Sequence, residues 1–193
     1  MSSSFLLDPY IINIVAEPGD TYLDVGCGLG KWGYLIKISH KKPLYMIGGD
    51  PDVEAIAFLK EHRPYDSTLR FSGCHLPFRE KIFDTSIVLE VIEHLQKSDG
   101  YKMLVEAERV AKKKVVVSTP LLGGRYWFRD DYHVSRWTPG DLRRKGYNVR
   151  GVGFSFFGYY STPQLAFGLS ALSYFIPWLS HILLGIKQLK TPH

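Results

Sequence analysis

A run of glycines after a short apolar stretch is the part of this sequence best suited to hold a ligand. In TYLDVGCGLGKWG, residues 21–33, the acidic Asp24 is followed by Gly26, Gly28 and Gly30. Glycine reaches positive φ and leaves the backbone bare, so a phosphate, ribose or adenosyl group can approach the loop and the amides of a helix expected from Lys31. The segment therefore predicts a nucleotide-type ligand.

The same residues fit two nucleotide motifs. Counted from Gly28, they match the G-x-G-x-x-G pattern of dinucleotide-binding folds, in which the strand runs almost to the first glycine. Here the apolar stretch ends at Val25, and Gly26 already breaks it. Counted from Asp24, the order of one acid and alternating glycines resembles motif I of class I S-adenosylmethionine-dependent methyltransferases. The register favours the second interpretation, and an NAD-dependent oxidoreductase stays open as the alternative.

A carboxylate, Asp50, stands at the end of the second apolar run. At that place in a doubly wound sheet a carboxylate can accept both hydroxyls of a ribose, and each hydrogen bond to a charged group contributes about 1.5–3 kcal/mol. The alternative is a helix cap, in which Asp50 or Asp52 accepts the free amides of the next helix. We expect Asp50 to bind ribose. Asp24 carries less weight, because a lone acid in a strand could serve only to fix the glycine loop.

A second group of chemically active residues follows the fourth apolar run, with Glu90, Glu93 and His94 close together. Histidine changes charge near neutral pH, so His94, or His133 further along, is a candidate base for a hydroxyl or an enolisable carbon. The alternative is that Glu93 and His94 only decorate the first turn of a helix. Cys74 and His75 have no second Cys or His close in sequence to complete a zinc spacing, so no metal ligand is predicted.

The elements that must position these residues alternate between strand and helix, which is typical of a parallel sheet covered on both faces. The pattern predicts strands at 22–25, 44–48, 68–71, 85–89, 114–118 and 147–154, and helices at 6–15, 31–39, 52–61 and 100–111, with another helix starting at 138–141. Because no repeat or low-complexity linker interrupts the chain, we expect one domain over 1–193 with its core at 20–155.

The tail is unusual because no Asp, Glu, Lys or Arg occurs from Gly151 to Ile186. A membrane span needs about 20 apolar residues, but Pro177 and His181 interrupt this stretch. We expect an apolar helix at 162–174 and a final strand at 182–190, both packed on the sheet within a C-terminal segment at 160–190. Membrane contact through 160–186, or a hydrophobic acceptor, is the less favoured alternative.

Composition narrows the class of protein. With 193 residues, 45% of them hydrophobic, the chain can bury one good core and has little room for a second. Only two cysteines are present and the polar N-terminus lacks a secretory pattern, so we expect a reduced, cytoplasmic protein. The net charge of +5 permits contact with nucleic acid, but the Lys and Arg residues are scattered and do not favour it.

Further segments resemble the same family, in the same order along 23–153. Leu76-Pro-Phe followed by Phe83-Asp, the run Leu89 to Leu95, the strand at 115–120, and His133 before Trp137-Thr-Pro are each similar to segments of small-molecule, type 11-like methyltransferases. The resemblance implies a Rossmann-like α/β fold with a seven-stranded, mostly parallel sheet and a final antiparallel strand. It also implies S-adenosyl-L-methionine as cofactor and a small-molecule methyl acceptor as partner.

The resemblance also implies roles for individual residues. The positions that match cofactor-binding positions of the family are Asp24, Gly26, Cys27, Gly28, Gly30, Asp50, Pro51, Ser72, Gly73, Cys74 and Glu90. His94 and His133 would face the acceptor. Ser72 stands where the family often has an acid that binds the adenine amino group, so a serine or backbone groups must serve the adenine here.

The acceptor class follows from absent motifs. The chain has no Asn/Asp-Pro-Pro-Tyr after the fourth strand, as in enzymes that methylate base amino groups, and no Pro-Cys pair, as in cytosine-5 enzymes. We therefore expect a small-molecule hydroxyl or carbon acceptor. A protein that binds the cofactor without catalysis is the alternative from another class.

Overall fold

A computed structural model of the protein describes residues 7–14, 21–39, 44–121, 133–154 and 172–190. The helices are α1 (Asp8–Ile14), α2 (Lys31–Ser39), α3 (Val53–His62), α4 (Lys97–Val110) and α5 (Pro139–Arg143), with short 3-10 turns η2 (Ile92–His94) and η4 (Pro177–Leu179). The strands are β1 (Thr21–Val25), β2 (Tyr45–Asp50), β3 (Ser67–Arg70), β4 (Phe83–Leu89), β5 (Ala111–Pro120), β6 (Asn148–Phe154) and β7 (Ser180–Gln188).

The chain forms two compact units. Unit 1 contains residues 1–89, 102–115 and 188–193, and unit 2 contains residues 90–101 and 116–187. Strand β5 contributes its first half to unit 1 and its second half to unit 2. Each unit carries one group of the residues that the sequence singles out for chemistry, and the two groups are described separately below.

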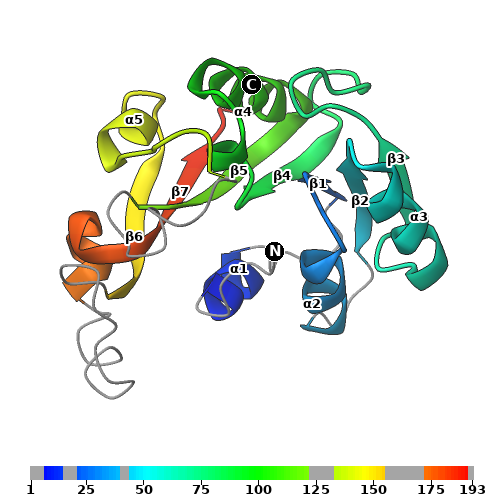
Figure 1. Ribbon diagram of the computed structural model, residues 1–193, viewed down its shortest axis with the longest axis horizontal. Helices are drawn as coiled ribbons and strands as arrows, with labels where there is room; N and C mark the ends of the chain where they lie inside the picture. The colour runs from blue at the N-terminus through cyan, green and yellow to red at the C-terminus, as the bar shows by residue number, and fades with distance from the viewer. Residues whose placement is uncertain (1–6, 15–20, 40–43, 122–132, 155–171, 191–193) are drawn as a thin grey trace. The chain divides into compact units, whose positions relative to one another are not determined.

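The strands pair in the order β3-β2-β1-β4-β5-β7-β6. Strand β1 is parallel to both β2 and β4, and β2 is parallel to β3, whereas β7 runs antiparallel to β6 (Figure 1). This confirms the predicted seven-stranded, mostly parallel α/β fold with an antiparallel final strand. The order reverses between β1 and β4, and in such sheets ligands bind at the carboxyl ends of the strands where the order reverses.

Strand β1 is rich in apolar residues because it lies in the core of unit 1. Tyr22, Leu23 and Val25 are all fully buried, as expected of a strand covered on both faces. Helix α2 has the predicted bounds. Helix α3 begins after Asp52, whose side chain accepts a hydrogen bond from the amide of Glu54 and thereby caps the helix.

Helix α4 begins at Lys97, earlier than the predicted start at residue 100. Its first turn is polar, so it lacks the apolar periodicity from which the start was inferred. Position 100, inside this helix, requires a glycine because a Cβ there would lie 2.5 Å from the Trp137 ring. Strand β5 likewise extends beyond the predicted 114–118 at both ends.

Unit 2 ends in the charge-poor tail. Ile182, Leu183 and Leu184 in β7 are almost completely buried, so this part of the tail is core. Of the predicted helix at 162–174, only the last residues are described, and residues 172–175 are helical. Residues 160–171, which are part of the segment 160–186 named for the alternative of membrane contact, lie outside the described ranges. Among the residues that are described, no helix is both long and apolar enough to cross a membrane.

Candidate functional site

The glycine loop of unit 1 has the positive-φ backbone that its composition predicts. Gly26, Gly28 and Gly30 all have positive φ, at 76°, 51° and 84°. The amides of Gly26 and Cys27 both donate to the carbonyl of Gly49, at 2.8 and 3.1 Å, which ties the loop to the end of β2. The loop is therefore a fixed turn at the carboxyl end of β1.

Two glycines of this loop differ in what a side chain would meet. A Cβ at Gly28 would meet no atom within 4 Å, so bare backbone faces open space there. A Cβ at Gly30 would lie 2.6 Å from Leu59 and 2.7 Å from Pro64, so this glycine allows α3 to pack closely. Of the two, Gly28 is the one placed to admit a ligand.

Asp50 closes the loop from the side of β2. One of its carboxylate oxygens accepts a hydrogen bond from the amide of Gly28 at 2.9 Å, and the other accepts from the amide of Asp52 at 3.0 Å. An ionised carboxylate has about four acceptor positions, so the described residues leave about two for a ligand. The helix cap proposed as the alternative role is performed by Asp52. These remaining acceptor positions fit the two hydroxyls of a ribose, which would donate to them.

Asp24 lies beneath the loop and pairs with Tyr65, a residue that no sequence motif indicated. The Tyr65 hydroxyl donates to Asp24 at 2.6 Å and accepts from the amide of Gly33 at 3.3 Å. Burial is the main reason why the pKa of Asp24 is raised from 3.8 to about 7; the hydrogen bond from Tyr65 opposes the rise and the charge of Asp50 adds to it. Asp24 and Tyr65 thus connect β1 to the start of α2.

Cys27 and Pro51, both predicted to contact the cofactor, have different surroundings. The Cys27 thiol is buried, and burial raises its pKa above the ordinary value, so it is not a reactive thiolate. Pro51 is exposed beside Asp50, and its carbonyl accepts a hydrogen bond from Arg70 at 3.0 Å.

The segment predicted to serve the adenine forms a tight turn after β3. Ser72 is exposed, and its hydroxyl accepts a hydrogen bond from the amide of Cys74 at 3.3 Å. Gly73 is buried, and a Cβ there would lie 2.3 Å from Met103, so packing alone requires a glycine. Their contacts with a cofactor stay a prediction.

An ion pair on α4 holds the residues that follow this turn. Glu106 accepts a hydrogen bond from the amide of Leu76 at 2.8 Å, and Arg109 donates to the carbonyls of Leu76 and Phe78 at 3.0 and 2.8 Å. Arg109 also bonds Glu106 through two nitrogens, each at 2.7 Å. The Leu-Pro-Phe segment of the sequence therefore owes its shape to polar contacts with α4.

In unit 2, Glu90 has a left-handed backbone with φ of 57°, which is uncommon for a residue other than glycine. Its amide donates to the Ser118 carbonyl at 3.1 Å, and its carboxylate accepts from the Ser118 hydroxyl at 2.8 Å. Such a backbone costs about 1–3 kcal/mol and persists only where the surroundings enforce it. The two bonds to Ser118 hold Glu90 in this conformation.

Glu93, His94 and His133 come together in unit 2. Glu93 is 1% exposed, so it does not decorate the surface of a helix start. Its Oε2 accepts from the Thr119 hydroxyl at 2.9 Å, and its Oε1 lies 3.9 Å from Nε2 of His94. The rings of His94 and His133 have centroids 5.1 Å apart. Burial, and then the charge of Glu90, raise the pKa of Glu93 well above its ordinary value.

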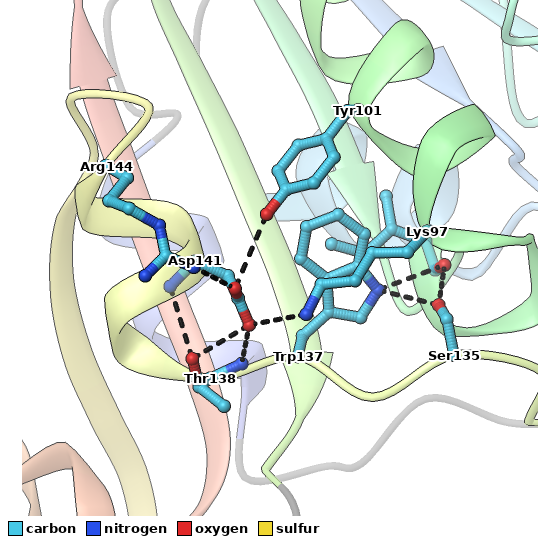
Figure 2. Close-up of polar contacts among 8 residues, drawn as sticks. Lys97, Tyr101, Ser135, Trp137, Thr138, Asp141 and Arg144 are labelled. Carbon is cyan, nitrogen blue, oxygen red and sulfur yellow. Dashed lines mark hydrogen bonds and ion pairs between the residues drawn. The ribbon is translucent and has the colours of Figure 1, made fainter.

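Backbone contacts bring His133 to this group. The Glu93 carbonyl accepts hydrogen bonds from the amides of Val134 and Ser135, at 2.8 and 3.0 Å. The Ser135 hydroxyl donates to the carbonyl of Ile92 at 3.1 Å, and the Trp137 ring nitrogen contacts that carbonyl at 3.2 Å and the Ser135 hydroxyl at 3.0 Å (Figure 2). Residues 133–137 are thereby fixed along η2.

Asp141 anchors the far end of the same segment. Its carboxylate accepts from Lys97 at 2.8 Å, from the Thr138 hydroxyl at 2.8 Å and from Tyr101 at 3.4 Å, and it also pairs with Arg144 (Figure 2). Burial acts to raise the pKa of Asp141, but the hydrogen bonds from Lys97 and Thr138 outweigh it and the pKa lies below its ordinary value. This network connects α5 to the start of α4.

Comparison with known proteins identifies a family. Residues 23–118 match the family model of a methyltransferase domain. A search of curated proteins gives no significant match.

Solved structures share the fold at low identity. A chain in the complex between the Haloferax volcanii Trm112 methyltransferase activator and a methyltransferase has a TM-score of 0.71 at 16% identity, covering 98% of this chain and 90% of that one. An S-adenosylmethionine-dependent methyltransferase from Archaeoglobus fulgidus has a TM-score of 0.68 at 16% identity, covering 95% and 93%. Magnesium protoporphyrin IX methyltransferase from Synechocystis, with bound S-adenosylmethionine, has a TM-score of 0.61 at 15% identity, covering 94% and 76%.

Proposed function

Because residues 23–118 place the chain in the methyltransferase-domain family, whose cofactor is S-adenosylmethionine, we propose that the protein transfers a methyl group to a small-molecule hydroxyl or carbon acceptor. The family match decides against the NAD-dependent alternative, in agreement with the early break of the strand at Gly26.

One observation carries the cofactor side of this proposal: Asp50 is fixed by the Gly28 amide at the carboxyl end of β2, beside backbone that faces open space. A carboxylate in this position can bind the ribose hydroxyls, and the Gly28 backbone leaves room for the amino acid part of the cofactor. The cofactor supplies a methyl group that carries its own leaving group. What the chain must supply is position and the exclusion of water.

Proton removal is the remaining task, since a hydroxyl or an enolisable carbon must lose a proton when it is methylated. His94 and His133 offer two imidazoles at neighbouring positions, and imidazole is the side chain best suited to accept a proton near neutral pH. In this proposal they face the acceptor. A hydrophobic acceptor is included in the class.

Titration calorimetry with S-adenosylhomocysteine tests the cofactor side. Asp50→Ala removes a charged acceptor of two hydroxyls and is expected to weaken binding at least tenfold, which corresponds to about 1.4 kcal/mol. Asp52→Ala is the matched control, because it removes the neighbouring carboxylate that caps α3. We expect this control to lose helix stability and to keep its affinity. Equal affinity of Asp50→Ala and the wild-type protein would contradict the proposal.

Turnover separates an enzyme from a protein that only binds the cofactor. The measurement is release of S-adenosylhomocysteine in the presence of a panel of phenols, alcohols and β-dicarbonyl compounds. Release that depends on one of these acceptors supports catalysis. Tight cofactor binding with no acceptor-dependent release from the panel would favour the non-catalytic alternative.

A further inference from the structure

The carboxylate and the two imidazoles of unit 2 form a set of metal ligands. Glu93, His94 and His133 each offer one ligand atom, and these atoms all lie within 4.8 Å of one another. Ligand atoms about 2.1 Å from a single ion are about 3.4 Å apart in a tetrahedral site, so binding would draw the three ligand atoms together by at most about 1.4 Å.

The carboxylate of this set is oriented by the protein. Thr119 donates to Oε2 of Glu93 at 2.9 Å, and Oε1, the other oxygen, is the one that lies 3.9 Å from Nε2 of His94. Hydrogen bonds that orient a ligand in this way are common around metal ions and strengthen their binding. Glu93 therefore presents one oxygen to the histidines while the second is occupied.

The backbone that carries the two histidines is also fixed. The Glu93 carbonyl binds the amides of Val134 and Ser135, directly after His133. Trp137 and Ser135 in turn bind the carbonyl of Ile92 (Figure 2). The segments that carry His94 and His133 are thus held together by hydrogen bonds that do not involve the two imidazole rings.

Electrostatics favours a cation at this place. Glu93 is 1% exposed, and Glu90 is close enough for its charge to act on Glu93. A buried carboxylate is costly unless it is protonated, paired or bound to a metal ion.

The ligand types narrow the choice of ion and leave room for a further ligand. Two imidazole nitrogens with one carboxylate suit Zn²⁺, Fe²⁺, Co²⁺ or Mn²⁺ better than Mg²⁺ or Ca²⁺, which prefer oxygen. Three protein ligands leave coordination positions open, as in catalytic metal sites. Such a position accepts a hydroxyl oxygen and makes the loss of its proton to solvent water easier, so in this arrangement the two imidazoles act as ligands in place of the base role proposed above.

We propose that Glu93, His94 and His133 bind one divalent transition-metal ion, and that its open coordination positions receive a hydroxyl oxygen of the methyl acceptor. The metal site stands on the geometry alone, whereas the role of the hydroxyl rests on the proposed methyl transfer. Of the two acceptor types under consideration, this inference selects the hydroxyl. It also departs from the sequence, which predicted no metal ligand.

Cobalt titration of the full chain, after chelator treatment and dialysis, tests the site. The expected result is one Co²⁺ per chain, with the visible absorption of a site that contains nitrogen ligands. His94→Ala and His133→Ala should each weaken Co²⁺ binding at least tenfold. His62→Ala, which removes an exposed histidine at the end of α3, is the matched control and should bind Co²⁺ as the wild-type protein does.

Two results would overturn the metal site: no Co²⁺ binding by the folded wild-type protein, or binding that His94→Ala and His133→Ala leave unchanged. Glu93→Gln is a third variant, but its side chain is buried, so circular dichroism must first show that it folds. The two histidine variants decide the question in any case, because their rings are only partly buried.

Acetohydroxamate, an oxygen chelator, tests the open positions. If they exist, its addition to the Co²⁺-loaded protein changes the visible spectrum; an unchanged spectrum would overturn the hydroxyl role. Calorimetry with S-adenosylhomocysteine on the metal-free protein is measured in parallel. If the metal-free protein did not bind S-adenosylhomocysteine, the proposed function would be contradicted. The cobalt titration tests the metal site independently of that result.

Discussion

Asp24 provides a sharp test of the loop architecture, because a fully buried carboxyl with a raised pKa makes stability depend on pH in a definite direction. In the folded chain its pKa is about 7, against 3.8 for an ordinary Asp. Between these values the folded state binds a proton that the unfolded state does not. The contribution of Asp24 to the free energy of unfolding is therefore fully present below pH 3.8, and it is lost as the pH rises through about 7.

The substitution Asp24→Asn removes this titration and keeps an oxygen that accepts the hydrogen bond from Tyr65. From the two pKa values, Asp24 costs the wild-type protein roughly 2.5 kcal/mol of unfolding free energy between about pH 5 and about pH 8. The variant does not incur this cost. Relative to the wild-type protein, Asp24→Asn should therefore gain roughly 2.5 kcal/mol over the same interval.

Urea unfolding at both pH values, followed by tryptophan fluorescence, measures this difference. Other titrating groups are common to both proteins and cancel in the comparison. The exposed Glu61→Gln on α3 is the control for loss of a carboxylate that is not buried. If the unfolding free energies of Asp24→Asn and wild-type protein differed by the same amount at both pH values, the buried, protonated Asp24 inferred here would be refuted.

Two further predictions concern residues with well-defined contacts. Gly30→Ala should lower the unfolding free energy by about 2–4 kcal/mol, since overpacking adds to the strain of positive φ. Gly28→Ala should lower it by only about 1 kcal/mol and should mainly weaken binding of S-adenosylhomocysteine. Urea unfolding measures the stabilities and calorimetry the affinities, and equal losses of stability in the two variants would contradict the different roles assigned to these glycines. Asp141→Ala should destabilise the protein by about 2 kcal/mol, because it breaks the capping box of α5 and removes the acceptor that Lys97 and Thr138 share. Acid should weaken the same contacts in the wild-type protein as the pH falls below the ordinary pKa of Asp, since the pKa of Asp141 is lowered in the fold. A thermal unfolding midpoint equal to that of the wild-type protein would contradict this prediction.

The fold was predictable because local signals and tertiary structure agree. The buried run at 22–25, the glycine turn after it and the capping residues Asp52 and Thr138 each act within a few residues. The start of α4 was predicted three residues late, since its first turn faces polar partners such as Asp141 and shows no apolar spacing. Boundaries of this kind depend on contacts with distant residues, which a window of sequence does not contain.

The candidate site was predictable only in part. Position in the chain was enough to single out Asp50, because the end of a strand beside a glycine loop has few possible roles. Tyr65 has no such marker: its hydroxyl bridges Asp24 and Gly33, and only the folded chain brings these residues together. The proposed metal ligands lack a marker for the same reason, since His133 is far from His94 in the sequence and only the fold brings them together.

Two segments that each resemble the methyltransferase family, 89–95 and 133–137, are joined to each other by hydrogen bonds in this chain. Residues 133–137 bind the carbonyls of Ile92 and Glu93 through two amides, one hydroxyl and one indole nitrogen. These bonds fix the backbone of η2 from outside, so His94 and Glu93 owe their positions to residues that follow His133. Side chains on a short turn need such support to keep a fixed position, because a three-residue helix cannot hold its own conformation. The sequence His-Val-Ser-Arg-Trp at 133–137 therefore acts first as a support for η2, and the proposed role of His133 depends on that support.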